Sequence, residues 1–401
     1  MSASYGMDSV DAVVVGGGTI GAWTACFLAE AGRSVVLVEA GTLGAGASSR
    51  AAGMVRAQGG TEAAIRLGMF SREFYSTQQD RYPFDSGFVA QGYLMPCFTT
   101  DEVRAAHERI ALQRSLGLDV EWLAGHDVDR RHTGLAPGCT LGASYADGDG
   151  YLDAPRNVLA YTAALVALGV DVREHTAFTG LRVSSGRVTG VETSAGPIFA
   201  DRVVLTGGPD LASVGRLAGG VVPTGGTRHQ VVVTAPLSDV DVHTLPMVFD
   251  VASGIYWRPG ESGGLLWGMS NPDERPGPAR EFDWHYYATM RTRVAQLLPV
   301  TAGVPLRRAW AATIDYTPDH LPILGPLLRD GAPVHGTVVA AAGGHGMMWG
   351  PGVARAAADL ALYGRTELLD VTDLGLDRFD ADGRSKLAAD PVALPFPQTV
   401  T

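Results

Sequence analysis

Apolar runs alternate with glycine turns at the start of the chain. The run Val10 to Val15 predicts a short buried β-strand, and the run Val35 to Val38 predicts a second one. Between them a helix is expected over residues 20–31, ending at Gly32. A strand, a glycine turn, a helix and a second strand in this order indicate a Rossmann-like α/β unit.

The rest of the chain mixes helical and strand-like patterns. Helices are expected over residues 61–79, 101–116, 157–168 and 284–298, and from Pro351 to about Tyr363. Strands are expected within residues 84–96, 171–205, 228–313 and 337–342. We take Asp101 as the N-cap of its helix. The tail after Leu376 is polar, and we expect it to be peripheral.

Three glycines follow the first strand at the spacing GxGxxG, namely Gly16, Gly18 and Gly21. The first allows a tight turn, the second lets a pyrophosphate approach the backbone, and the third lets the helix pack close to the strand. Glu39 ends the second strand, where its carboxylate can accept hydrogen bonds from both hydroxyls of an adenosine ribose. This context predicts a dinucleotide site and disfavours NADP, whose 2′-phosphate Glu39 would repel. The alternative is a glycine-rich turn in an unrelated sheet protein.

Composition narrows the class of protein. The chain has 401 residues, 46% apolar and 18% charged, which is typical of a globular protein with a large core. Its net charge of −11 argues against nucleic acid and anionic membranes, and no run approaches the roughly 20 apolar residues of a membrane helix. Residues 1–9 lack a secretory signal, and Cys26, Cys97 and Cys139 have no metal-binding spacing. We therefore expect a cytoplasmic protein with reduced thiols and no metal site.

Two further features concern a bound ligand. Residues 40–60 are rich in glycine, alanine and serine, which indicates a close approach of backbone to a ligand. Only one of the 31 basic residues is a lysine, Lys386 in the tail. No lysine from the body of the chain can therefore act near a cofactor.

Several ordered segments resemble the D-amino-acid oxidase superfamily of FAD-dependent oxidoreductases. They include VVVGGGTIGAWTACFLAEAGRSVVLVEA, GAGASSRAAGMVRAQ, TPDHLPILGP and AAGGHGMMWGPGVAR. The sarcosine oxidase branch, with the β-type subunits of proline dehydrogenases, is the most similar. The resemblance reaches about residue 380 and implies FAD rather than NAD.

The resemblance implies an α/β (α+β) fold in which a Rossmann-like FAD-binding domain carries an inserted antiparallel-sheet substrate domain. We assign residues 1–82, 145–224 and 317–380 to the first domain, residues 83–144 and 225–316 to the second, and residues 381–401 to a C-terminal tail. The expected FAD contacts are Gly16, Gly18, Thr19, Ile20, Gly21, Glu39, Ala47, Ser48, Ser49, Arg50, Val172, Gly207, Gly344, Gly346, Met347 and Met348. Backbone N–H groups of the last stretch and the helix at Pro351 are expected to favour the reduced flavin.

Three residues are candidates for the substrate site. Arg56 matches an arginine that binds the substrate carboxylate in the family, although it can equally bind a flavin phosphate or a surface acid. His345 either faces the substrate or shapes its turn. Tyr256 either lines the pocket or packs in the core, and alternation sends Trp257 to the opposite face. His229, Trp310 and Asp319 are weaker candidates that we expect to be structural.

The chain departs from the sarcosine oxidase pattern at three positions. Leu266 replaces a lysine that assists the reaction with oxygen, Met348 replaces a lysine that helps bind the carboxylate, and Ala312 replaces the cysteine that links covalently to FAD. We therefore expect non-covalent FAD, a more apolar pocket, and a dehydrogenase rather than an oxidase.

The expected reaction is oxidation of a C–N bond of an amino acid or secondary amine, by hydride transfer to flavin N5, to an imine. The expected partners are the small-molecule substrate and an electron-acceptor protein or partner subunit. The alternatives are an oxygen-using oxidase of the sarcosine oxidase type and a flavin-binding subunit of a hetero-oligomeric dehydrogenase.

Overall fold

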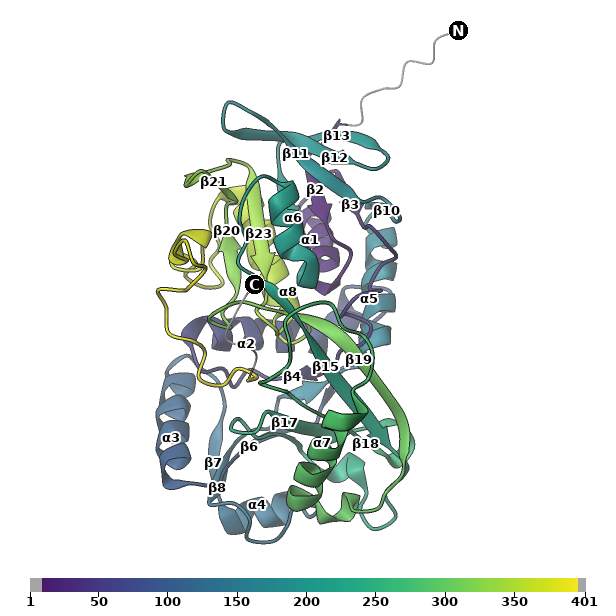
Figure 1. The fold of residues 1–401 in the computed structure, drawn as a ribbon, viewed down its shortest axis with the longest axis vertical. Coiled ribbons are helices and arrows are strands. Elements are labelled where there is room, and N and C mark those ends of the chain that lie inside the picture. Colours follow the sequence, from purple (N-terminus) through teal and green to yellow (C-terminus); the bar gives the residue numbers. More distant parts are fainter. Residues whose placement is uncertain (1–8, 396–401) are drawn as a thin grey trace.

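The computed structural model describes residues 9–395, which form two large sheets and three smaller ones, joined by helices and loops (Figure 1). The upper sheet in the view has six strands in the order β10-β3-β2-β14-β23-β20. The first five are parallel, and β20 is antiparallel to β23. Their bounds are Asp171–Arg173, Val35–Val38, Ala12–Val15, Val203–Leu205, Thr337–Ala341 and Ile323–Gly325.

Alternate residues of this sheet pack on its two faces. Val14 and Leu37 join an apolar core with the helices, whereas Val13 and Val36 join another with a β-meander and α6. The helices are α1 (Thr19–Glu30), α2 (Glu62–Ser76), α5 (Ala154–Ala167) and α8 (Gly350–Tyr363), with α6 (Leu211–Leu217) opposite. The meander belongs to a four-stranded sheet. Its strands, in order, are β1 (Ser9–Val10), β13 (Gly196–Ala200), β12 (Arg187–Thr193) and β11 (Phe178–Ser184).

The lower sheet in the view has eight strands in the order β19-β15-β18-β17-β16-β6-β8-β7. All neighbours are antiparallel except β16 and β6, which are parallel. Their bounds are Leu306–Tyr316, Gly225–Thr234, Leu265–Met269, Ile255–Pro259, Met247–Phe249, Tyr93–Cys97, Gly142–Ala146 and Glu121–Ala124. Both the α/β class and the second, largely antiparallel sheet are as expected from the sequence.

Helices and short strands complete the fold. Apolar residues of α7 (Trp284–Leu297) and α4 (Gly125–Arg131) pack in the core on one face of the eight-stranded sheet. The remaining elements are α3 (Thr100–Ser115), the three-stranded sheet of β4 (Met54–Val55), β9 (Gly150–Tyr151) and β5 (Val89–Ala90), and the hairpin of β21 (Leu328–Arg329) and β22 (Ala332–Pro333). None of the helices in residues 9–395 is long and apolar enough to cross a membrane.

Local hydrogen bonds correct several expected boundaries. The first apolar run divides at Asp11 into β1 and β2, because Asp11 accepts from the backbone and hydroxyl of Ser34. The N-cap of α3 is Thr99, not Asp101, since its hydroxyl accepts from the N–H of Glu102 in a capping box. Helix α5 begins three residues early because the Asp153 carboxylate caps it.

The described part of the tail, residues 377–395, is not peripheral, contrary to expectation. Arg378 and Asp319 form a buried ion pair at 2.8 Å, and the side chain of Val392 is fully buried. The segment runs back toward β4, where the yellow trace of Figure 1 returns to the centre of the molecule. Val392 stands in a short apolar run interrupted by prolines, which shows neither helical nor strand periodicity, so the pattern did not reveal this packing. The expectation for residues 1–8 and the end of the tail, 396–401, lies outside the described residues.

Candidate active site

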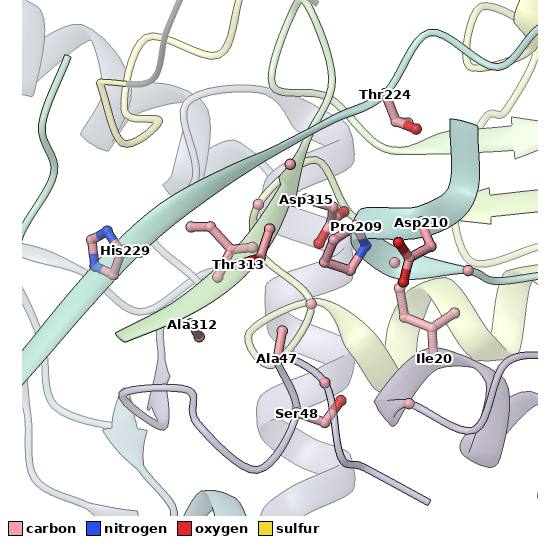
Figure 2. Close-up of a pocket in the computed structure, with 18 of the residues that line it drawn as sticks. Ile20, Ala47, Ser48, Pro209, Asp210, Thr224, His229, Ala312, Thr313 and Asp315 are labelled. Carbon is pink, nitrogen blue, oxygen red and sulfur yellow. The ribbon is translucent and has the colours of Figure 1, made fainter. Parts of the chain in front are cut away.

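A cleft of about 1140 Å³ lies between the turns that follow strands of the six-stranded sheet and residues of the eight-stranded sheet. Its walls include the turns that follow β2, β14 and β23, the glycine-rich loop after β3, and strands β15 and β19. The carboxyl ends of parallel strands therefore meet there, which is where ligands bind in open α/β sheets. In Figure 2, His229 lies on one side of the view and Ile20 and Asp210 on the other, with Ala312 and Asp315 between them.

The turn between β2 and α1 requires its glycines. Gly16 has φ +102°, and a Cβ there would lie 2.8 Å from the carbonyl oxygen of Thr206. A Cβ on Gly21 would lie 1.9 Å from the carbonyl oxygen of Gly16, so the helix packs against the turn without a side chain between them. Gly18, the N-cap, offers no side-chain cap, and its neighbour Thr19 donates its N–H to the hydroxyl of Ser48 at 3.0 Å. Because the helix has no side-chain cap, the other N–H groups at the start of α1 are available to an anion in the cleft.

Glu39 joins the two glycine-rich segments. Its Oε2 accepts from the N–H of Gly17 and its Oε1 from the N–H of Gly41, both at 2.7 Å. Each carboxylate oxygen keeps a further lone pair. The side chain lines the cleft, so those lone pairs are available to the hydroxyls of a ribose.

The late turn places His345 beside the cleft. Gly343 and Gly344 before it have φ +58° and +98°. The imidazole is buried and lies 4.0 Å from the ring of Trp349, and within the described residues neither ring nitrogen has a hydrogen-bond partner. Burial lowers the pKa of His345 to about 3, with a smaller contribution from the charge of Arg56. His345 is therefore a neutral group facing a ligand space.

Arg56 follows β4 and is a buried cation, 3% exposed. Its Nη1 donates to the carbonyl of Gln58 and its Nη2 to the carbonyl of Val392 at 2.7 Å. The guanidinium carbon lies 5.2 Å from the ring centre of Phe249. No carboxylate of the described residues lies within ion-pairing distance of it. The charge of Arg56 acts to lower the pKa of the buried Asp390 carboxyl, against the larger effect of burial. A buried arginine with no carboxylate within ion-pairing distance, in a cleft wall, is suited to an anionic ligand group.

Tyr256 on β17 lines the cleft together with His229 on β15. The Nε2 of His229 lies 2.7 Å from the phenolic oxygen of Tyr256, and burial lowers the pKa of His229 to about 4. Trp257 turns to the other face and donates its Nε1–H to His132, as alternation predicts. His229, taken from the sequence as structural, is thus a wall residue of the cleft.

The structure separates the expected cofactor residues into two groups. Those in the cleft wall are Gly16, Gly18, Thr19, Ile20, Glu39, Ala47, Ser48, Arg50, Gly207, Gly344, Gly346, Met347 and Met348. Gly21, Ser49 and Val172 lie outside it; Gly21 sets the helix packing, and Val172 pairs with Leu37 in the edge strand β10. Of the weaker candidates, Trp310 donates to the carbonyl of Arg50, and Asp319 is occupied by Arg378.

The wall residues that sequence reasoning missed include Asp315, Tyr93 and Leu394. Burial raises the pKa of the Asp315 carboxyl, although the N–H groups of Gly343 and Gly344 act in the opposite direction, and its Oδ2 has no partner among the described residues. The one feature of the sequence that could have indicated Asp315 is the position of an acid near the end of an apolar strand. Tyr93 and Leu394 also line the cleft. Tyr93 stands in the segment GYLMP, which resembles the family, but sequence reasoning assigned it no role in the site, and Leu394 stands in no motif.

The model of the family described as FAD dependent oxidoreductase matches residues 11–360. The chain belongs to this family. It is 29% identical over 386 residues to 4-methylaminobutanoate oxidase (formaldehyde-forming) of Paenarthrobacter nicotinovorans, covering 92% of this chain and 46% of that protein. It is 30% identical over 330 residues to glycine oxidase of Geobacillus kaustophilus, covering 79% and 84%. The chain thus spans less than half of the first relative.

A solved member of the same fold is L-proline dehydrogenase from P. horikoshii. It superimposes with a TM-score of 0.83 at 25% identity, covering 90% of this chain and 96% of that one. FAD is the cofactor of the family, and the cleft fits it. The glycine turn has no room for side chains, the Glu39 carboxylate borders it, and helix α1 begins there without a side-chain cap. This geometry fits the FAD that the family uses.

Proposed function

We propose that this protein oxidises a C–N bond of a secondary amine or amino acid that carries a carboxylate, producing an imine. The observation that carries the proposal is Arg56, a buried cation without a carboxylate partner among the described residues, in the wall of the FAD cleft. Its planar N–H groups suit the carboxylate of such a substrate. The names of the relatives, which include a glycine oxidase and a methylaminobutanoate oxidase, support the same class of substrate.

Bound FAD supplies the hydride acceptor. The side chains of the chain itself select the protonation state of the substrate. His229 and His345 are neutral at physiological pH because burial lowers the pKa of each, and Arg56 is positive. A protonated amine would gain no charge stabilisation from these groups and would be repelled by Arg56. These three groups therefore favour the neutral amine, whose lone pair drives hydride departure from the adjacent carbon.

Apolar wall residues limit water at the reacting carbon. Phe249, Met348 and Leu394 line the cleft near the polar groups. Exclusion of water strengthens the attraction between Arg56 and a carboxylate, which positions the substrate. Hydride loss from the neutral secondary amine leaves an iminium ion, and hydrolysis of this ion gives a carbonyl product and a smaller amine.

We favour a dehydrogenase over an oxidase. The reason is that the lysine that assists the reaction with oxygen in the sarcosine oxidase pattern is replaced by Leu266, which packs in the apolar cluster that contains Tyr256. The single lysine of the chain, Lys386, instead donates to the carbonyl of Asp377. A second candidate is a flavin-binding subunit of a larger assembly. The chain is 25% identical over 323 residues to the sarcosine oxidase subunit beta of an Arthrobacter species, covering 79% of each, which supports that candidate.

The test is anaerobic bleaching of the flavin by a panel of secondary amines and amino acids, followed by air. Bleaching by carboxylate-bearing amines, with slow recovery in air, is the expected result. A flavin that no amine bleaches rules out C–N oxidation by the isolated chain. Rapid recovery with formation of hydrogen peroxide identifies an oxidase. Poor turnover that a co-purifying protein restores identifies a subunit.

A further inference from the structure

The segment from Asp390 to Leu394 is partly buried beside the cleft, although Pro391 is exposed. Asp390 is 4% exposed, and Val392 is fully buried. Val392 and Leu394 pack in the apolar cluster that also holds Tyr93, Phe249 and Tyr256. Leu394 itself lines the cleft. The segment therefore forms part of the same wall as the residues that would contact a substrate.

This segment also holds the guanidinium of Arg56. The carbonyl oxygen of Val392 accepts from Nη2 at 2.7 Å, across 336 positions of sequence. Together with the carbonyl of Gln58, it occupies two of the five N–H groups of the arginine. Two carbonyls on different nitrogens fix the plane of the guanidinium. The remaining N–H groups then have a set direction for an incoming anion.

Asp390 holds the turn that carries the Val392 carbonyl. Its own carbonyl accepts at 3.2 Å from the N–H of Ala393, which belongs to the same peptide group as the Val392 carbonyl. Its Oδ1 accepts from the N–H of Val392 at 3.0 Å in a local side-chain turn. Its own N–H donates to the carbonyl of Asp319, which is paired with the buried Arg378. The contacts thus run from a buried ion pair, through the Asp390 turn, to the arginine of the cleft.

We propose that residues 390–394 are a specificity element of the substrate site. Asp390 and Val392 position Arg56 for a carboxylate, and Leu394 limits the size of the group bound beside it. This inference rests on the proposed role of Arg56. Asp390 and Val392 are positioning residues, because they act on the ligand through Arg56.

Two variants of Asp390 separate its turn from its charge. Both Asp390→Ala and Asp390→Asn remove the carboxylate, but only the asparagine keeps an oxygen that accepts from the N–H of Val392. The measurement is the affinity of the holoenzyme for acetate, which is monitored through the change in flavin absorption. Acetamide serves as the uncharged probe. This readout requires no turnover, so it can succeed even if no amine bleaches the flavin.

Asp390→Ala is expected to weaken acetate binding about tenfold, which is the effect of displacing one charge-assisted hydrogen bond. The affinity for acetamide is expected to stay within about twofold of the wild-type value. Asp390→Asn is expected to restore acetate binding to within about threefold of the wild type. Equal weakening of acetate and acetamide, or equal acetate affinities of the two variants, would overturn the positioning role.

Leu394→Ala tests the wall independently and does not depend on the folding of the Asp390 variants. It is expected to tighten binding of a bulkier carboxylate, such as benzoate, relative to acetate. Leu328→Ala is the matched control, since Leu328 is also a partly buried leucine but packs in the core behind the six-stranded sheet. An unchanged benzoate-to-acetate ratio in Leu394→Ala, or the same change in Leu328→Ala, would overturn the size-limiting role.

Discussion

The Nε2 of His229 lies 2.7 Å from the phenolic oxygen of Tyr256, although strand β18 runs between their strands. Gly268 of β18 makes this contact possible. A Cβ at Gly268 would lie 2.4 Å from that oxygen, so any other residue would displace the tyrosine. A glycine inside a strand weakens it, and here it allows two side chains to meet across the face of the sheet.

The two side chains are expected to act on the substrate as one unit. Tyr256→Phe and His229→Asn should each lower kcat/KM about tenfold, because each removes the same hydrogen bond. The double variant should lose little more than either single one, since residues that share one interaction are not additive. Steady-state kinetics on flavin-loaded enzyme measures this. Tyr286→Phe is the control, because its hydroxyl donates to the carbonyl of Ser270 outside the cleft. Additive losses would show that the pair does not work together.

Arg56→Gln should impair substrates according to their charge. For amines with a carboxylate, kcat/KM should fall about 100-fold or more, as expected when one partner of a buried charge pair is removed. Uncharged amines should change by only a few fold. Arg280→Gln is the control, because Arg280 is an exposed arginine of the same cleft wall. Equal losses for charged and uncharged amines would remove Arg56 from the anchoring role.

The fold was predictable where the sequence shows continuous apolar runs. Strands β3 and β14 are buried on both faces, so their four and three residues are all apolar. Strand β7 and helix α4 were missed for the opposite reason. Strand β7 has no buried residue, and Val128 is the only buried residue of α4, so neither shows a periodic pattern.

The site was predictable where glycine is required by the backbone. Gly16 and Gly344 have positive φ, and such positions leave a signature in the sequence. The roles of Asp390 and Val392 could not be predicted, because they depend on one carbonyl reaching Arg56 from the other end of the chain. Main-chain acceptors are the same at every residue, so the sequence carries no signal for such a contact.

Acid should destabilise the protein through its buried histidines. Burial lowers the pKa of His132 and His229 to about 4 and of His345 to about 3, below the value of about 6.5 of the unfolded chain. Below about pH 6.5 the unfolded chain therefore binds more protons than the folded one. The stabilisation is present above pH 6.5 and is lost as the pH falls toward 4, by up to about 1.4 kcal/mol per pH unit for each histidine.

Urea unfolding between pH 5 and 8 measures this slope. His132→Gln should lower the slope of unfolding free energy against pH by the contribution of about one proton. The glutamine oxygen can still accept from Trp257, but it does not titrate. His126→Gln is the control, since the side chain of His126 is 71% exposed. The same slope in His132→Gln and in the wild type would contradict the lowered pKa of His132.

FAD should leave the protein on denaturation. No cysteine is among the described residues that line the cleft, and Ala312 stands on β19 where the sarcosine oxidase pattern has the linking cysteine. Precipitation with acid should therefore release all the flavin into the supernatant, where its absorption is measured. Flavin that stays in the washed pellet would show a covalent bond to another side chain.

Gly16→Ala should abolish retention of FAD. A Cβ at this position meets the carbonyl of Thr206 at 2.8 Å, and φ of +102° costs a residue with a side chain about 1–3 kcal/mol. The turn must then open, which moves the N–H groups at the start of α1 away from the pyrophosphate. Gly46→Ala is the matched control, because Gly46 also lines the cleft but has no atom within 4 Å of its Cβ position. The ratio of flavin to protein absorption after gel filtration should fall near zero for Gly16→Ala and stay unchanged for Gly46→Ala. Full flavin retention in Gly16→Ala would show that this turn does not hold the cofactor.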